Sequence, residues 1–240
     1  MDYKSTENWI LSRLPSYQAI GKKAYNPGLK NVVKFLSTLD LPIDSLNLIH
    51  VGGTNGKGST SSYISSILQE SNYQVGIFSS PHFFDFRERI KINNQKISKS
   101  FIVDFVNKYK SLIEELELSF FELSFCISLA YFVHNDVDYG VIEVGLGGRL
   151  DATNIINPLI SVITNISYDH TDILGNSLEM IALEKAGIFK KNSTIIIGER
   201  NDSVDEIFIN KANEVSSKIT FVPDYNCLLY TSDAADDKQC

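Results

Sequence analysis

Residues 50–63, which read HVGGTNGKGSTSSY, contain the residue types that bind phosphate. The stretch departs from the usual phosphate-loop spelling, G-x-x-x-x-G-K-[ST], because Gly58 follows Lys57 and the hydroxyl of Ser59 comes one position late. Glycines let backbone amides approach phosphate oxygens, a lysine adds a cation, and the hydroxyl of Ser59 or Thr60 can bind Mg²⁺. The sequence therefore predicts a phosphate-binding loop made by Thr54, Asn55, Gly56, Lys57, Gly58, Ser59 and Thr60.

Further motifs follow this loop along the chain. They are SSPH at 79–82 and then RERI, FFE at 120–122, EVGLGGRLDATN at 143–154, DHTDILG at 169–175 and EKAGI at 184–188. In this order, and together with GTNGKGS, they resemble the motifs of the folylpolyglutamate synthase/dihydrofolate synthase family within the Mur-ligase superfamily. The resemblance covers roughly residues 5 to 222. The combination of EVGLGGRLDATN, DHT and EKAGI is highly specific.

The resemblance implies an ATP-dependent ligase that joins L-glutamate to dihydropteroate, to (tetrahydro)folate polyglutamates, or to both. Because a carboxylate is a poor electrophile, transfer of the γ-phosphate of ATP first makes an acyl phosphate, which the amine of glutamate then attacks. This chemistry requires positioned phosphates, neutralised charge and Mg²⁺, and two Mg²⁺ sites are expected. Which acid is the substrate stays open.

The resemblance also implies a first Mg²⁺ site made by Ser80, Glu143 and His170. Ser80 and Glu143 stand at or near the C-terminal ends of predicted strands, where ligands of open α/β sheets gather, and His170 follows the predicted strand at 162–167. Mg²⁺ prefers oxygen ligands, so by ligand type alone Mn²⁺ is also allowed. The predicted catalytic residues are Lys57, Glu143, His170 and Lys185.

Lys185, in the EKAGI motif, aligns with a lysine that the family carries as a carbamate. Carbon dioxide added to the amine makes an anionic oxygen ligand for a second Mg²⁺. Only the resemblance supports this modification. The residues by themselves also allow a helix-surface lysine paired with Glu184 or Glu179.

For the pterin-bearing acid, the resemblance implies an aromatic wall and an acidic acceptor, which suit a flat ring with amino and amide edges. The matching positions are Phe120, Phe121, Glu122, Leu150 and Asp151. The segment AYNPG at 24–28 matches the family's pterin contact weakly. His82 is assigned to positioning only. Arg87 and Arg89 could steer anions or be solvated charges of a hairpin, and the second interpretation is favoured.

Alternating strands and helices must position these residues. Short apolar runs predict strands at 46–51, 73–80, 138–148, 159–167, 193–199 and 219–223, and a hairpin at 87–97 that turns at Asn93 and Asn94. Helical periodicity predicts helices at 6–14, 29–39, 59–70, 100–116, 122–135, 178–189 and 205–218. The pattern indicates an α/β fold of the phosphate-loop type, with a mostly parallel sheet and helices on both faces, as in the central domain of Mur ligases.

The composition is that of an ordinary globular protein, with 240 residues, 43% of them hydrophobic and 21% charged. A net charge of -7 argues against nucleic acid as the main partner, and no stretch approaches the ~20 apolar residues of a membrane span. Cys126, Cys227 and Cys240 are too scattered for a disulfide framework or a zinc site. Because the N-terminus is not a signal peptide, we expect a cytoplasmic protein. We also expect a monomer whose partners are small molecules.

Residues 1–226 are interpreted as one ATP-binding domain of the Mur-ligase type. The pattern of strands and helices stops there, and residues 227–240 are interpreted as a foreign or disordered tail that looks like translated cloning DNA. The family's smaller C-terminal α/β domain is expected to be absent. We therefore expect little or no ligase activity from the 240-residue chain alone.

Three other functions stay open at this level. One is a different Mur-type ligase, which joins another acid and amine, although FFE and the LDATN extension favour folate. Another is a phosphate-loop kinase or GTPase, against which the Lys-Gly-Ser spelling and the lack of an NKxD motif count. The last is a non-catalytic nucleotide-binding fragment.

Overall fold

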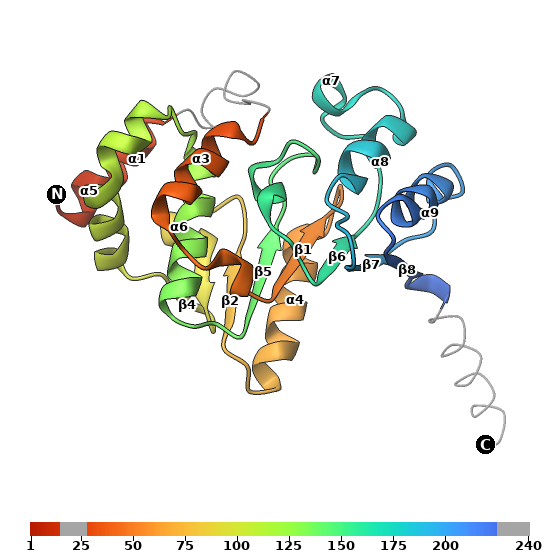
Figure 1. The fold of residues 1–240 in the computed structure, drawn as a ribbon, viewed down its shortest axis with the longest axis horizontal. Coiled ribbons are helices and arrows are strands. Elements are labelled where there is room, and N and C mark those ends of the chain that lie inside the picture. The colour runs from red at the N-terminus through yellow and green to blue at the C-terminus, as the bar shows by residue number, and fades with distance from the viewer. Residues whose placement is uncertain (15–27, 225–240) are drawn as a thin grey trace.

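A computed structural model describes residues 1–14 and 28–224 (Figure 1). Most of the AYNPG segment at 24–28 and all of the predicted tail at 227–240 lie outside the described residues, as do Cys227 and Cys240. Within the described ranges, helices and strands alternate along the chain. No helix in these ranges is long and apolar enough to cross a membrane.

A sheet of eight strands forms the centre of the described structure, in the order β4-β3-β2-β5-β1-β6-β7-β8. The strands are β1 (Leu48–Gly52), β2 (Val75–Phe78), β3 (Ile90–Ile92), β4 (Gln95–Lys96), β5 (Tyr139–Glu143), β6 (Ile160–Ile163), β7 (Thr194–Ile197) and β8 (Lys218–Phe221). Six neighbouring strands run parallel to one another: β2, β5, β1, β6, β7 and β8. The β3–β4 hairpin adds an antiparallel edge next to β2. The predicted α/β fold with a mostly parallel sheet is therefore confirmed.

Helices cover both faces of this sheet (Figure 1). They are α1 (Tyr3–Arg13), α3 (Lys30–Leu39), α4 (Lys57–Glu70), α5 (Lys99–Glu115), α6 (Phe120–His134), α7 (Thr171–Leu174), α8 (Leu178–Ala186) and α9 (Asp205–Glu214), with short 3₁₀ turns η2 (Ile43–Ser45), η3 (Phe86–Arg89) and η4 (Ala152–Ile155). Helix α4 packs on one face, where Ile64 and Leu68 contact the cluster that contains Val51 and Val141.

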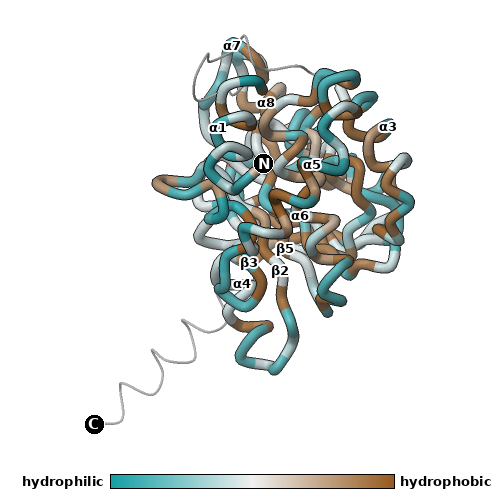
Figure 2. The backbone as a smooth tube through the Cα atoms, turned by 90° about the vertical axis from the view of Figure 1, so that its left-hand side faces the viewer, coloured by the Kyte–Doolittle hydropathy of each residue, from teal (hydrophilic) through white to brown (hydrophobic). Residues whose placement is uncertain are grey.

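The opposite face carries the larger apolar clusters. One joins Phe78 and Ile142 of the sheet to α1, α3, α5 and α6, and a second joins Ile163 and Ile195 to α8 and α9. Neighbouring residues such as Val141 and Ile142 enter different clusters because successive side chains of a strand point to opposite faces. In Figure 2, apolar segments run through the region labelled β2, β5 and α6.

Helix starts differ from the predicted ones where a capping side chain lies further upstream. Helix α1 begins at Tyr3 rather than at residue 6, because the carboxylate of Asp2 accepts the N–H of Ser5 at 2.8 Å. Helix α6 begins at Phe120 rather than at residue 122, because Ser119 and Glu122 form a capping box. The short helix α7 was not predicted, since four residues carry no periodic signal.

Candidate active site

The predicted phosphate loop connects β1 to α4 at the C-terminal edge of the sheet. Helix α4 begins at Lys57, two residues earlier than predicted, and its N-cap Gly56 has a φ of +78°. Because the first intrahelical bond runs from Thr60 N to Gly56 O, the amides of Lys57, Gly58 and Ser59 precede it, and no side chain caps them. These amides and the positive end of the helix dipole favour a negative charge at this position.

Two lysines converge on one carbonyl of this loop. Nζ of Lys57 donates to the carbonyl oxygens of Gly53 at 3.1 Å and Thr54 at 2.9 Å, and Nζ of Lys185 donates to Gly53 O at 2.8 Å. Burial, followed by the charge of Lys57, lowers the pKa of Lys185 to about 8, against the opposing charges of Asp169 and Asp151. The predicted residues Lys57 and Lys185 are thus brought together, although they are far apart in sequence.

Thr54 and Asn55 fasten the loop to the segment that follows β6. Oγ1 of Thr54 lies 3.2 Å from the carbonyl oxygen of Ser167, and the N–H of Asn55 donates to Asn165 Oδ1 at 3.1 Å. Oγ1 of Thr164 donates to the carbonyl oxygen of Asn55 at 2.6 Å. These contacts hold the loop in shape, while the hydroxyls of Ser59, which is exposed, and Thr60, which is half-buried, stand on the first turn of α4.

Glu143 and Ser80 meet at the C-terminal ends of the neighbouring strands β5 and β2. Oε2 of Glu143 accepts the N–H of Ser80 at 2.9 Å, and Oε1 lies 3.5 Å from the position that a Cβ atom of Gly58 would occupy. The Glu143 side chain is buried, and this burial raises its pKa, whereas the Ser80 amide and the charges of Lys57 and Arg89 lower it. The carboxylate therefore lies against the first turn of α4, next to its uncapped amides.

His170 follows β6 and lies at the start of α7. It is the N-cap of α7, has a φ of +47°, and its Nε2 lies 3.5 Å from Oδ2 of Asp169. Among residues 1–14 and 28–224, no three His, Cys, Asp or Glu side chains gather as a metal cluster. The predicted set of Ser80, Glu143 and His170 thus lies along one sheet edge, after β2, β5 and β6, without forming a closed protein cage.

Two of the predicted substrate residues meet at Gly145. A Cβ atom placed there would lie 2.5 Å from Cζ of Phe121 and 3.0 Å from Oδ2 of Asp151, so the ring and the carboxylate flank the same backbone position. Phe121 and Leu150 are half-buried, and Asp151 is buried. The structure therefore brings an aromatic ring and an acidic group, two of the predicted substrate residues, to the same backbone position.

Phe120 and Glu122 have structural contacts instead. Phe120 is 2% exposed and packs against Phe86, with ring centroids 5.6 Å apart. Glu122 is buried, and its Oε2 accepts the N–H of Ser119 at 2.8 Å in the capping box of α6. Adjacent residues of one motif thus point to different surroundings, which the sequence alone did not distinguish.

The prediction that Arg89 is a solvated charge is wrong. Its side chain is buried, Nε donates to Nδ1 of His82 at 2.7 Å, and the guanidinium lies 4.9 Å from the ring centroid of Phe120. Burial lowers the pKa of Arg89 to about 10, and the charge of Glu143 opposes this shift. Arg89 is thus a buried cation beside the Glu143–Ser80 pair, and its place directly after SSPH in the motif order was the available signal.

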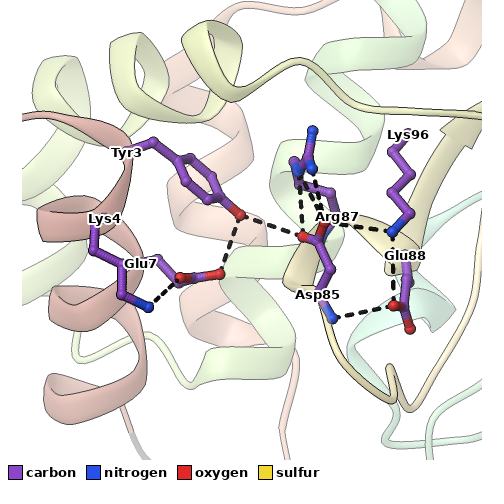
Figure 3. Close-up of polar contacts among 7 residues, drawn as sticks. All are labelled: Tyr3, Lys4, Glu7, Asp85, Arg87, Glu88 and Lys96. Atoms are coloured by element: carbon purple, nitrogen blue, oxygen red, sulfur yellow. Dashed lines mark hydrogen bonds and ion pairs between the residues drawn. The ribbon is translucent and has the colours of Figure 1, made fainter.

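A polar network connects α1 to the segment that carries Asp85 and Arg87 (Figure 3). The hydroxyl of Tyr3 lies 3.2 Å from Oε1 of Glu7 and 3.5 Å from Oδ1 of Asp85. Burial raises the pKa of Asp85, but hydrogen bonds from Arg87 and Lys96 outweigh it and bring this pKa to about 2. Arg87, unlike Arg89, is therefore an ion-pair partner near the surface, 2.7 Å from Asp85.

The fold and this edge define a parallel α/β domain of the phosphate-loop type, with acidic and basic side chains around the loop. The family profile described as Mur ligase middle domain matches residues 51–234. Since this match spans most of the chain, the chain belongs to the Mur ligase middle domain family.

Relatives in this family confirm the resemblance to folylpolyglutamate synthases. The chain is 36% identical over 239 residues to the dihydrofolate synthase/folylpolyglutamate synthase of Bacillus subtilis (strain 168), covering 97% of this chain and 54% of that protein. A folylpolyglutamate synthase (FPGS) structure with AMPPCP and folate has a TM-score of 0.83 and 31% identity, covering 92% of this chain and 54% of the other.

A further solved structure is that of a bifunctional folylpolyglutamate synthase/dihydrofolate synthase with Mn, AMPPNP and L-glutamate bound. It has a TM-score of 0.74 and 33% identity, with 82% of this chain and 48% of the other covered. The chain thus spans about half the length of the relatives that it matches.

Proposed function

We propose that this chain is the nucleotide-binding part of an ATP-dependent ligase that joins a pterin-bearing acid, dihydropteroate or a folate, to L-glutamate. The proposal rests on what gathers at one edge of the sheet. There, the uncapped start of α4 lies with the two lysines that donate to the Gly53 carbonyl and with the Glu143–Ser80 pair. The relatives bound to ATP analogues, folate and L-glutamate support the choice of ligands.

In this proposal, the phosphates of ATP bind over the first turn of α4, where the amides of Lys57, Gly58 and Ser59 and the ammonium group of Lys57 favour negative charge. Transfer of the γ-phosphoryl group to the carboxylate of the acid then makes an acyl phosphate and releases ADP. The amine of glutamate attacks the acyl carbon, which forms the amide bond and releases inorganic phosphate and a proton. The residues of this chain orient the phosphates and hold the acid in place, which removes most of the entropic barrier.

The residues present fit a divalent cation. Glu143 offers carboxylate oxygens and Ser80 and Ser59 offer hydroxyls, which are the ligands that Mg²⁺ prefers, and His170 would add an imidazole. Mg²⁺ in such sites is bound by one or two carboxylates plus the phosphates of the substrate, so a closed protein cage is not required. When bound, the ion neutralises phosphate charge.

For Lys185, we expect a carbamate that ligates a second Mg²⁺. The amine is buried, and its lowered pKa of about 8 favours the neutral form that reacts with carbon dioxide. ¹³C NMR of the chain in ¹³C-labelled bicarbonate is expected to show one carbamate carbon that disappears in Lys185→Met. Retention of that signal in the variant would place the modification elsewhere.

The experiment that tests the proposed function measures binding to the 240-residue chain by calorimetry. AMPPNP is expected to bind only with Mg²⁺ or Mn²⁺ present, and dihydropteroate is expected to bind with micromolar affinity, about 8 kcal/mol. An acid without a pteridine ring, such as 4-aminobenzoate, serves as the matched control. A chain that binds no nucleotide, or that binds both acids equally, would contradict the proposal.

A further inference from the structure

His50 is a buried histidine that the proposed reaction does not use. It lies on β1, three residues before Gly53, and its side chain is 0% exposed. Burial, followed by the charge of Lys190, lowers the pKa of its imidazole to about 3. The ring is therefore neutral near pH 7 and carries a single N–H, on either Nδ1 or Nε2.

Asp151, one of the two groups that flank Gly145, accepts hydrogen bonds on both carboxylate oxygens. The N–H of Thr153 donates to Oδ1 at 3.0 Å, and the N–H of Leu146 donates to Oδ2 at 2.8 Å. Burial raises the pKa of Asp151 and outweighs the donors, of which the Thr153 hydroxyl has the largest opposing effect. Each donor thus favours the ionised carboxylate and restricts its orientation.

A hydroxyl links this carboxylate to His50. Oγ1 of Thr153 makes a short hydrogen bond to Oδ1 of Asp151, and the same Oγ1 lies 2.8 Å from Nε2 of His50. A threonine hydroxyl has one hydrogen, and an ionised carboxylate can only accept, so this hydrogen points to Asp151. It follows that His50 donates from Nε2 to Thr153 as long as Asp151 is ionised.

The hydrogen-bonded chain from His50 through Thr153 to Asp151 connects strand β1 to the turn η4. His50 belongs to the strand that leads into the phosphate loop, whereas Asp151 follows β5 and faces Phe121 across Gly145. A donor that itself accepts a hydrogen bond is polarised and donates more strongly, and this effect is larger in a buried site. Removing the Thr153 hydroxyl takes one donor from Asp151, whereas removing the His50 imidazole takes away the hydrogen bond that polarises this hydroxyl.

We propose that His50 and Thr153 are positioning residues that hold Asp151 as an oriented, ionised acceptor for the amino edge of the pteridine ring. The inference rests on the proposed function, because it needs the pteridine ring to bind next to Phe121 with its amino edge at Asp151. Neither residue touches the substrate in this arrangement. Both act through the carboxylate of Asp151.

The test uses Thr153→Val, which keeps the shape of the side chain and removes the hydroxyl, and Thr153→Ser, which restores it. Calorimetry with dihydropteroate is expected to show about tenfold weaker binding in Thr153→Val and near wild-type binding in Thr153→Ser. Binding of Mg–AMPPNP is expected to stay within about twofold in both. A merely structural role would lower both affinities together.

A second pair of variants tests the same hydrogen bond from its other side, in case the Thr153 variants do not fold. His50→Gln keeps an N–H near the position of Nε2 and is expected to retain dihydropteroate binding, whereas His50→Leu is expected to weaken it by no more than the roughly tenfold loss in Thr153→Val. ¹⁵N NMR of the wild-type imidazole is expected to show a protonated Nε2 and a bare Nδ1 from about pH 5 to 9. A protonated Nδ1 would overturn the donor direction.

Two failures can be told apart. If the wild-type chain binds no dihydropteroate, the proposed function fails and this role fails with it. If the wild-type chain binds dihydropteroate and Thr153→Val binds it equally well, only the inference about His50 and Thr153 is overturned.

Discussion

Replacing Lys57 with methionine is expected to weaken binding of Mg–AMPPNP about 100-fold. Lys57 is the first residue of α4, and its Nζ is held at 3.1 and 2.9 Å from the carbonyl oxygens of Gly53 and Thr54, beside the uncapped amides. A hydrogen bond to a charged partner contributes about 1.5–3 kcal/mol, and the upper end of this range corresponds to roughly two factors of ten. Methionine keeps the length of the side chain and removes its charge.

The matched control is Lys211→Met, which removes the same charge from α9, where Lys211 pairs with Glu214 at 2.6 Å. It is expected to leave the affinity unchanged, because an exposed ion pair contributes little. Thermal unfolding of both variants accompanies the calorimetry, since Lys57→Met also loses two hydrogen bonds within the loop. Equal affinities in wild type and Lys57→Met would mean that the loop does not bind phosphate.

A Gly53→Ala substitution is expected to lower the free energy of unfolding by about 3 kcal/mol and to abolish nucleotide binding. Gly53 has a φ of +137°, which an alanine rarely adopts, and a Cβ atom would overlap Oγ1 of Thr164 and lie 2.9 Å from its backbone N. That backbone cannot retreat easily, because the N–H of Thr164 donates to Gly52 O at 3.0 Å. The carbonyl of Gly53, which both lysines use, would then shift.

Gly56→Ala provides the control for Gly53→Ala within the same loop. Gly56 has a φ of +78°, but a Cβ atom there would meet nothing within 4 Å. Only the strain of the left-handed conformation remains, about 1 kcal/mol. Urea unfolding followed by circular dichroism measures both losses. If the two variants lost equal stability, the close approach to Thr164 would not be the cause.

The order of strands and helices could be predicted because its signals are local. The strand β1, buried along its whole length, follows from a short apolar run that ends in glycines, and the helix after it follows from Gly-Lys-Gly-Ser-Thr. Apart from the missed short helix α7, the differences in the helices lie at their ends, where a capping side chain such as Asp2 or Ser119 moved the first turn upstream. Periodicity describes the middle of a helix and carries no information about such caps.

The surroundings of single site residues could not be predicted in the same way. Phe120 and Phe121 are neighbours in one motif. The ring of Phe120 contacts the guanidinium of Arg89, whereas the ring of Phe121 flanks Gly145. On a helix, successive residues point about 100° apart, so the tertiary packing of α6 decides which ring faces the candidate site. Arg89 was misjudged for a similar reason, since only the fold shows that His82 and Phe120 enclose it.

The sequence by itself determined the α/β fold, the family and the phosphate loop, because apolar runs, glycines and motif order are properties of short segments. The tertiary structure decided which residues meet: Lys57 with Lys185 at the Gly53 carbonyl, Glu143 with Ser80, and His50 with Thr153. The physical reason is that parallel strands bring their C-terminal ends to one edge of the sheet. Residues about 60 to 130 positions apart therefore become neighbours there, and no local pattern records their distances.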